Sequence, residues 1–215
     1  MDSDTLMYVK KTRLTRRESQ EATRERLIDA AERAFIRRGF DASSVEQIAE
    51  AAGFSRGAFY SNFRSKDELF MAVLKAKRKE IEGALDEIVR RESNPAQRLH
   101  AVLDWYVNQG VNRGWMMLET EFTLRACRNR AARLRMEQFN RQRMADYTAL
   151  VSTHFAESGG IPTGRAEAVA VSLFAAAKGL AELAMIDAEN SGKELYAECR
   201  DLVFKHLLPA DDKDQ

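Results

Sequence analysis

Apolar residues recur at three- and four-residue spacing along almost the whole chain, which is the period of an α-helix. In residues 19–38, for example, Leu27, Ala34 and Phe35 belong to one apolar stripe, and Gly39 ends it. The chain has only three prolines, and each lies at or near the boundary of a periodic segment. Because no convincing alternating strand pattern and no internal repeat interrupts this period, the sequence predicts an all-α fold.

Caps and breaks divide the chain into predicted helices. Their expected ranges are 19–38, 45–52, 55–61, 65–91, 94–112, 115–126, 130–157, 163–190 and 193–208. The clearest loop is residues 158–162, which contain glycine and proline, and a break at Arg113 and Gly114 ends the fifth helix. At about 1.5 Å per residue the fourth helix is roughly 40 Å long. It is therefore expected to connect a small N-terminal head to a separate helical body.

Composition excludes several classes of protein. The 215 residues carry 34 Lys+Arg against 33 Asp+Glu, and the two cysteines and three histidines lack the spacing of a disulfide framework or a metal site. No paired His/carboxylate spacing, phosphate loop or nucleophile elbow is present, so we expect no enzyme, no cofactor and no metal. The N-terminus lacks an apolar core of signal-peptide length, and no apolar stretch is long enough to span a bilayer. These features predict a cytoplasmic protein that does not enter the membrane.

The balanced net charge hides a basic N-terminus and an acidic C-terminus. Residues 1–18 contain five bases, and the segment from the first to the last of them has no acid: Lys10, Lys11, Arg13, Arg16 and Arg17. Such a segment is typical of an arm that contacts nucleic acid, and its alternative interpretation is a solvated flexible tail. Residues 211–215 form an acidic tail.

A second basic segment contains seven arginines and one acid between residues 125 and 143. The series has three interpretations: a solvated basic face, a site for an anion or acyl-CoA-type ligand, or a salt-bridge surface between subunits. The solvated face is the preferred one, because helical spacing does not gather all seven arginines on one side. For Glu119 and Glu121 a solvated helix face is likewise expected.

Residues 45–63 have the spacing of a helix-turn-helix. Ala49 is small where two helices must cross, and Gly53 stands where a tight turn requires a positive φ. The apolar wedge between the helices is predicted to consist of Ile48, Ala52, Phe54 and Phe59. The second helix of this unit keeps a polar face made of Ser55, Arg56, Tyr60, Ser61 and Asn62. Such a face suits the major groove, where Arg pairs with guanine and Asn with adenine.

Three segments together, AAERAFIRRGF, VEQIAEAAGFSRGAFYSNF and SKDELF, resemble the N-terminal domain of the TetR family of bacterial transcriptional regulators (TetR/AcrR-like). The resemblance covers about fifty residues, from Leu27 to Leu74. It implies a three-helix DNA-binding head over residues 19–66 and, over residues 67–210, a helical bundle for ligand binding and dimerisation.

The resemblance also implies roles for individual residues. Arg56 would read bases, and Gly57 and Ala58 would allow close approach to them. The other implied contacts lie with phosphates or nearby groups: Ser44, Tyr60, Asn62, and Lys66 together with the first amides of the fourth helix. The sequence departs from the family at two of these positions, with Ala58 where Thr is frequent and Asn62 where His or Tyr is frequent.

The body offers a candidate pocket and a candidate dimer interface. The predicted pocket residues are Trp105, Tyr106, Trp115, Met117, Phe122, Phe139, Met144, Tyr147 and Phe174, which suit a small apolar or amphipathic effector. The predicted interface, formed by the last two helices of each protomer, includes Val171, Phe174, Ala175, Lys178 and Leu202. For both sets the alternative is ordinary core packing.

The sequence thus predicts a ligand-responsive dimeric repressor that binds a palindromic double-stranded DNA operator. Two alternatives remain: a regulator without an effector, and a small all-helical ligand-binding protein or enzyme without DNA specificity.

Overall fold

The computed structural model describes residues 15–105, 113–155, 164–186, 198–199 and 201–202. Within the elements that the structure describes there are helices and no strand, as the apolar period predicts. The helices are α1 (Arg16–Arg38), α2 (Val45–Ala51), α3 (Arg56–Asn62), α4 (Lys66–Arg91), α5 (Pro95–Trp105), α6 (Arg113–Arg128), α7 (Arg130–Phe155) and α8 (Ala166–Ile186).

Local side-chain caps fix where the helices of the head begin. Ser44 and Gln47 form the predicted capping box of α2, and Ser65 caps α4 by accepting a hydrogen bond from the amide of Glu68. Gly53 has φ of +78°, so the turn between α2 and α3 uses the conformation that the sequence predicted.

The N-terminal boundary of the head differs from the expectation. A capping box between Thr15 and Glu18 starts α1 at Arg16 instead of at residue 19. Arg16 and Arg17 therefore belong to the first turn of a helix and not to an extended arm. The other arm residues, Lys10, Lys11 and Arg13, lie outside the described residues.

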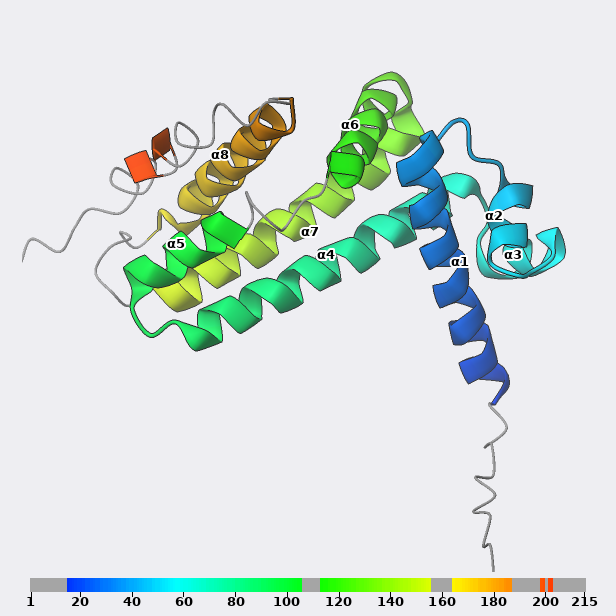
Figure 1. Ribbon diagram of the computed structural model, residues 1–215, viewed down its shortest axis with the longest axis horizontal. Helices are drawn as coiled ribbons and strands as arrows, with labels where there is room; N and C mark the ends of the chain where they lie inside the picture. The colour runs from blue at the N-terminus through cyan, green and yellow to red at the C-terminus, as the bar shows by residue number, and fades with distance from the viewer. Residues whose placement is uncertain (1–14, 106–112, 156–163, 187–197, 200, 203–215) are drawn as a thin grey trace, which may run out of the picture.

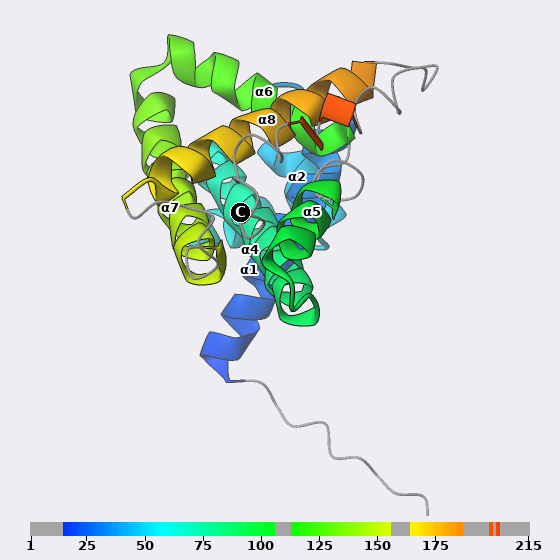
Figure 2. The same ribbon diagram turned by 90° about the vertical axis from the view of Figure 1, so that its left-hand side faces the viewer.

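The body is a bundle in which α7 packs against α4, α6 and α8, and α5 packs against α4. In Figure 1 the head lies at one end of α4, with α2 and α3 beside α1, and α6 lies next to the C-terminal end of α1. Figure 2 shows α4, α5 and α7 almost end-on, with α8 crossing them, and α8 packs mainly on α7. The predicted break at Arg113 and Gly114 is wrong, because these two residues form the first turn of α6.

The C-terminal third is only partly described. Helix α7 ends at Phe155, near its predicted end, and α8 begins at Ala166, two residues after Gly164 with φ of +89°. The predicted cap Thr163, the loop before it, most of the last predicted helix and the acidic tail lie outside the described residues.

One hydrophobic core runs without interruption from the head into the body. Phe122 of α6 stacks on Phe70 of α4, with ring centroids 4.2 Å apart and planes 10° apart, and its edge meets Phe40 after α1. Both Phe70 and Phe122 are 0% exposed. The head is therefore attached to the body by packed side chains as well as by the chain connection at residue 66.

Candidate nucleic-acid interface

Two phenylalanines hold α3 against the rest of the head. Phe59 and Phe63 are 0% and 1% exposed, so they are core residues and not platforms for stacking bases. The guanidinium of Arg24 on α1 lies 4.1 Å from the ring centroid of Phe63 and donates a hydrogen bond of 2.8 Å to the carbonyl of Asn62. Helix α1 thus contacts α3 directly and fixes its orientation.

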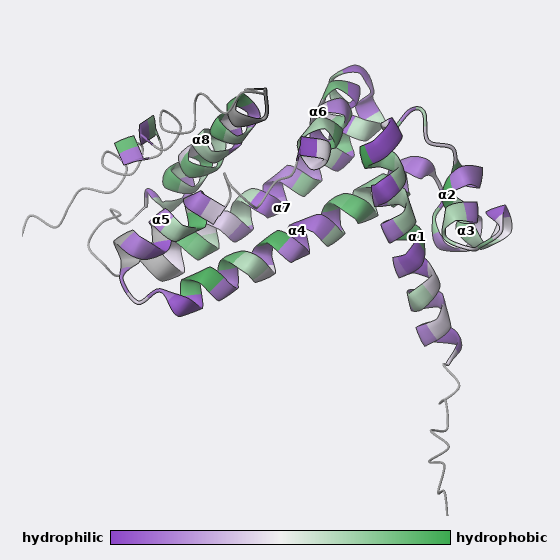
Figure 3. Ribbon diagram, in the orientation of Figure 1, coloured by the Kyte–Doolittle hydropathy of each residue, from purple (hydrophilic) through white to green (hydrophobic). Residues whose placement is uncertain are grey.

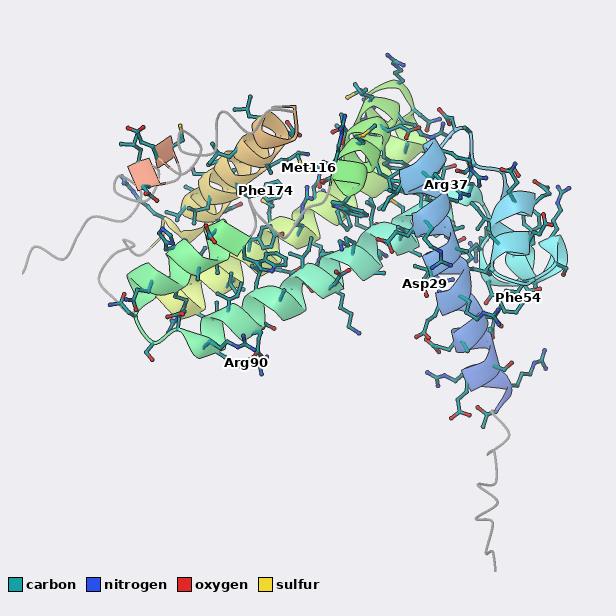
Figure 4. All side chains as sticks on the ribbon, in the orientation of Figure 1. Asp29, Arg37, Phe54, Arg90, Met116 and Phe174 are labelled. Atoms are coloured by element: carbon teal, nitrogen blue, oxygen red, sulfur yellow. The ribbon has the colours of Figure 1, made fainter. Side chains whose placement is uncertain are left out.

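The half-buried Phe54 completes the turn. It packs against the core of the head, and the guanidinium of Arg26 on α1 lies 4.8 Å from its ring centroid. Figure 4 shows Phe54 beside α3, on the side of the head away from the long helices of the body. The predicted apolar wedge is present, since Ile48, Ala52 and Phe59 are also buried.

The opposite face of α3 is polar and open to solvent. Ser55, Arg56, Gly57, Tyr60 and Ser61 are exposed, and Ala58 is half-buried. The two serine hydroxyls already have local partners, because Ser55 caps the amide of Ala58 and Ser61 donates to the carbonyl of Gly57. A Cβ on Gly57 would meet only a side-chain oxygen, at 3.6 Å, so the outer side of this turn is open.

Arg56 forms an ion pair that the sequence pattern does not predict. Its Nη1 lies 3.1 Å from Oε1 of Glu46 on α2, and the two side chains are 64% and 55% exposed. Its guanidinium is also 5.5 Å from the ring centroid of Tyr60. The spacing of residues 45–63 predicts that the two helices cross, but it does not say which of their exposed side chains meet, so the sequence analysis did not find this pair.

Asn62 is turned into its own helix. Its Nδ2 donates a hydrogen bond of 2.8 Å to the carbonyl of Ala58, and its Oδ1 is buried without a partner. The side chain that would reach a base or phosphate is therefore engaged within α3 in this structure.

Lys66, to which the resemblance assigns a phosphate contact, has its ammonium group among backbone carbonyls of the head. Its Nζ donates to the backbone carbonyls of Phe40, Asp41 and Ser43 at 2.8, 3.3 and 3.0 Å. An ammonium group has three donors, and all three are used here. Burial lowers the pKa of Lys66, with smaller opposing effects from neighbouring acids. Lys66 therefore holds the loop between α1 and α2.

The same loop is held from the body side. Both carboxylate oxygens of Glu121 accept a hydrogen bond from the amide of Phe40 at 3.0 Å. Arg125 lies one turn further along α6. Its Nη1 is 3.4 Å from Oδ1 of Asp41, and its Nε is 3.3 Å from Oδ1 of Asp67. Glu121 and Arg125 thus join the head to α6, which corrects the expectation that they lie on solvated faces.

A buried cluster of charges lies inside the body. Glu119 is 4% exposed, and its Oε1 lies 2.6 Å from Nη1 of Arg143, with Lys178 at 3.8 Å from its other oxygen. The guanidinium of Arg143 lies 4.4 Å from the ring centroid of Phe174 and 5.3 Å from that of Phe139. Glu119 and Arg143 are therefore core residues, contrary to the expected solvated faces.

The predicted pocket residues do not gather around one cavity. Phe139 and Phe174 lie against the guanidinium of Arg143, and Tyr147 packs on Phe174. Tyr147 and Trp105 each also pack against the cluster formed by Ile81, Leu85, Val89 and Val102. Trp115 and Phe122 belong instead to the core shared with the head, and Met117 is 57% exposed. Burial raises the pKa of Tyr147 to about 12. Tyr106 lies outside the described residues.

Helix α8 has an apolar exposed side. Val171 and Leu183 are 44% and 56% exposed, and Ala175 is exposed as well; Leu202, nearer the C-terminus, is 50% exposed. Figure 3 shows that much of α8 is hydrophobic. Val171 also lines a groove of about 910 Å³ between α7 and α8, together with Met144. Phe174 and Lys178 face the interior more, since Phe174 contacts Tyr147 and Arg143 and Lys178 pairs with the buried Glu119.

The described part of the chain contains neither a membrane-spanning helix nor a cluster of metal ligands. No described helix is both long and apolar enough to cross a membrane. Among the same residues, no group of three or more His, Cys, Asp or Glu side chains is arranged to hold a metal ion.

Comparison with known proteins relates this site to a family. Residues 27–73 match the sequence profile of the bacterial regulatory proteins of the tetR family. The chain is 46% identical over 74 residues to the uncharacterized HTH-type transcriptional regulator YwcC of Bacillus subtilis, and 50% identical over 62 residues to the HTH-type transcriptional regulator TtgR of Pseudomonas putida. These alignments cover 33% and 29% of this chain and 33% and 29% of the relatives, so the chain matches about a third of their length.

Solved structures extend the likeness to the whole fold. A transcriptional regulator from Rhodococcus sp. Rha1 has a TM-score of 0.69 at 24% identity, covering 86% of this chain and 95% of that one. A TetR-family transcriptional regulator from Agrobacterium tumefaciens has a TM-score of 0.63 at 18% identity, covering 88% and 99%.

Proposed function

We propose that this chain, whose residues 27–73 match the profile of the bacterial regulatory proteins of the tetR family, is a sequence-specific DNA-binding transcriptional regulator. The observation that carries the proposal is the polar face of α3, which presents the exposed Arg56 beside Tyr60 while Phe59 and Phe63 anchor the opposite face in the core. A helix presented in this way fits the major groove, and Arg56 is the residue that reads bases.

The test begins with selection of bound duplexes from a random pool, which returns the operator and the spacing of its half-sites. Arg56→Ala then lowers the ratio of operator affinity to random-duplex affinity by about tenfold or more at fixed salt. The matched control is Arg90→Ala, which removes the same charge from the far end of α4 (Figure 4). A wild-type protein without preference among duplexes would refute the proposal.

The regulator acts in the cytoplasm as a homodimer on a palindromic operator, because one recognition helix reads only a few base pairs. The apolar exposed side of α8, with Val171 and Ala175, supports an interface there. Val171→Glu is expected to raise the dissociation constant of the dimer, measured by sedimentation. Ala131→Glu, at an exposed position at the start of α7, is the control and leaves it unchanged.

A small apolar or amphipathic effector releases the repressor from DNA. The aromatic side chains Phe139, Tyr147 and Phe174 around the buried Arg143 support a binding region in the body. A thermal-shift screen identifies candidates, and a true effector also lowers operator affinity. If every stabilising compound leaves operator affinity unchanged, the alternative of a regulator without an effector is favoured.

A further inference from the structure

We propose that Glu46 is a positioning residue for Arg56, which it holds toward base edges and away from phosphates. The inference deepens the proposed function and rests on it. In α3, whose residues are Arg56–Asn62, Arg56 is the one cationic side chain and no acid is present. The charge that partners it comes from the first turn of the neighbouring helix α2.

The geometry leaves Arg56 able to read a base while it keeps this partner. Oε1 of Glu46 lies 3.1 Å from Nη1 of Arg56, and the arginine side chain is 64% exposed. A guanidinium has five N–H donors in a planar fork, and guanine uses two of them, at O6 and N7. An arginine held by the carboxylate at Nη1 can therefore present the edge formed by Nη2 and Nε to guanine.

The ion pair affects the binding of Arg56 to phosphate more than its binding to guanine. A phosphate is attracted by net positive charge, and a carboxylate at 3.1 Å neutralises that of Arg56. The edge of guanine offers neutral acceptors, so its pairing depends on the orientation of the fork more than on net charge. Glu46 consequently weakens binding to random DNA more than binding to the operator, and it raises the specificity of the head.

The experiment compares Glu46→Gln with Glu50→Gln in the full-length protein. Glu50 is an exposed acid one turn later on α2 without an ion pair among the described contacts, so both variants change the net charge equally. Affinities for the selected operator and for a scrambled duplex are measured over a range of salt concentrations. Glu46→Gln lowers the specificity ratio about two- to fivefold more than Glu50→Gln, the size expected of one exposed ion pair.

Two further readouts separate positioning from a general structural effect. The slope of log affinity against log salt for the scrambled duplex becomes steeper by up to about 0.9 in Glu46→Gln, because Arg56 gains a phosphate. In an Arg56→Ala background, Glu46→Gln and Glu50→Gln behave alike. Equal specificity ratios for the two variants in the wild-type background would overturn the inference alone. Absence of operator preference in the wild-type protein would overturn the proposed function and this inference with it.

Discussion

The buried ion pair between Glu119 and Arg143 predicts how the body responds to single and double substitution. The two side chains are 5% and 11% exposed, and the contact is 2.6 Å. Removing one partner leaves a buried charge without compensation, which costs about 3–5 kcal/mol. We expect the loss of stability in Glu119→Leu to lie near the upper end of this range. Arg143→Met lies near the lower end, because Glu119 then keeps Lys178, whose Nζ is 3.8 Å away.

The double variant, which combines Glu119→Leu with Arg143→Met, is expected to recover most of this loss. Its two apolar side chains replace the ion pair, and the introduced methionine packs on the rings of Phe139 and Phe174. Replacement of a buried pair in this way is often neutral or stabilising. We therefore expect the stability of the double variant within about 1 kcal/mol of the wild type or above it. In the double variant Lys178 keeps its ion pair with Glu182, whose Oε1 is 3.9 Å from Nζ.

Equilibrium unfolding in urea measures the four free energies of unfolding. All four are measured at one fixed protein concentration, because the proposed dimerisation would make stability depend on concentration. Glu137→Leu is the control, since its ion pair with Arg133 spans 3.9 Å and is more than half exposed on both sides. It should change stability by less than about 1 kcal/mol. A cost below about 1 kcal/mol for Glu119→Leu, or additive costs in the double variant, would refute the reasoning.

Four further predictions concern single residues. Phe122→Ala should cost about 3–5 kcal/mol in the same urea assay, since the ring is 0% exposed, and a cost below about 1 kcal/mol would contradict the shared core. Gly53→Ala should lower the melting temperature, because φ is +78° and the new Cβ would lie 3.0 Å from Nη2 of Arg26; an unchanged melting temperature would argue against that turn. Ser44→Ala should cost about 1 kcal/mol through loss of the cap of α2, and Ser44→Asp, which keeps an acceptor, should restore it. Tyr147 should ionise near pH 12, and Tyr147→Phe should remove that step from the absorbance titration.

The sign of the Tyr147 effect follows from the direction of its shift. Its folded pKa of about 12 lies above the ordinary value of 10, so burial favours the neutral phenol. The stability linked to this group is complete below pH 10 and is lost as pH rises toward 12. Tyr147→Phe should therefore flatten the fall in stability over that interval.

The sequence by itself determined the features that arise from residues close together in the chain. The all-α fold follows from the apolar period, the starts of α2 and α4 follow from Ser44 and Ser65, and the turn of the head follows from Gly53. Each depends on spacings of a few residues, for which helix geometry alone decides which groups meet. The polar face of α3 was predictable for the same reason.

Only the tertiary structure decided which charged groups are buried and with whom they pair. Glu121 meets the amide of Phe40 across 81 positions, Lys66 meets its carbonyl across 26, and Arg143 meets Glu119 across 24. Helical spacing places such side chains on a face but does not say what that face packs against. The crossing angles of α6, α7 and α4 settle that question, and they follow from how the whole core fills space.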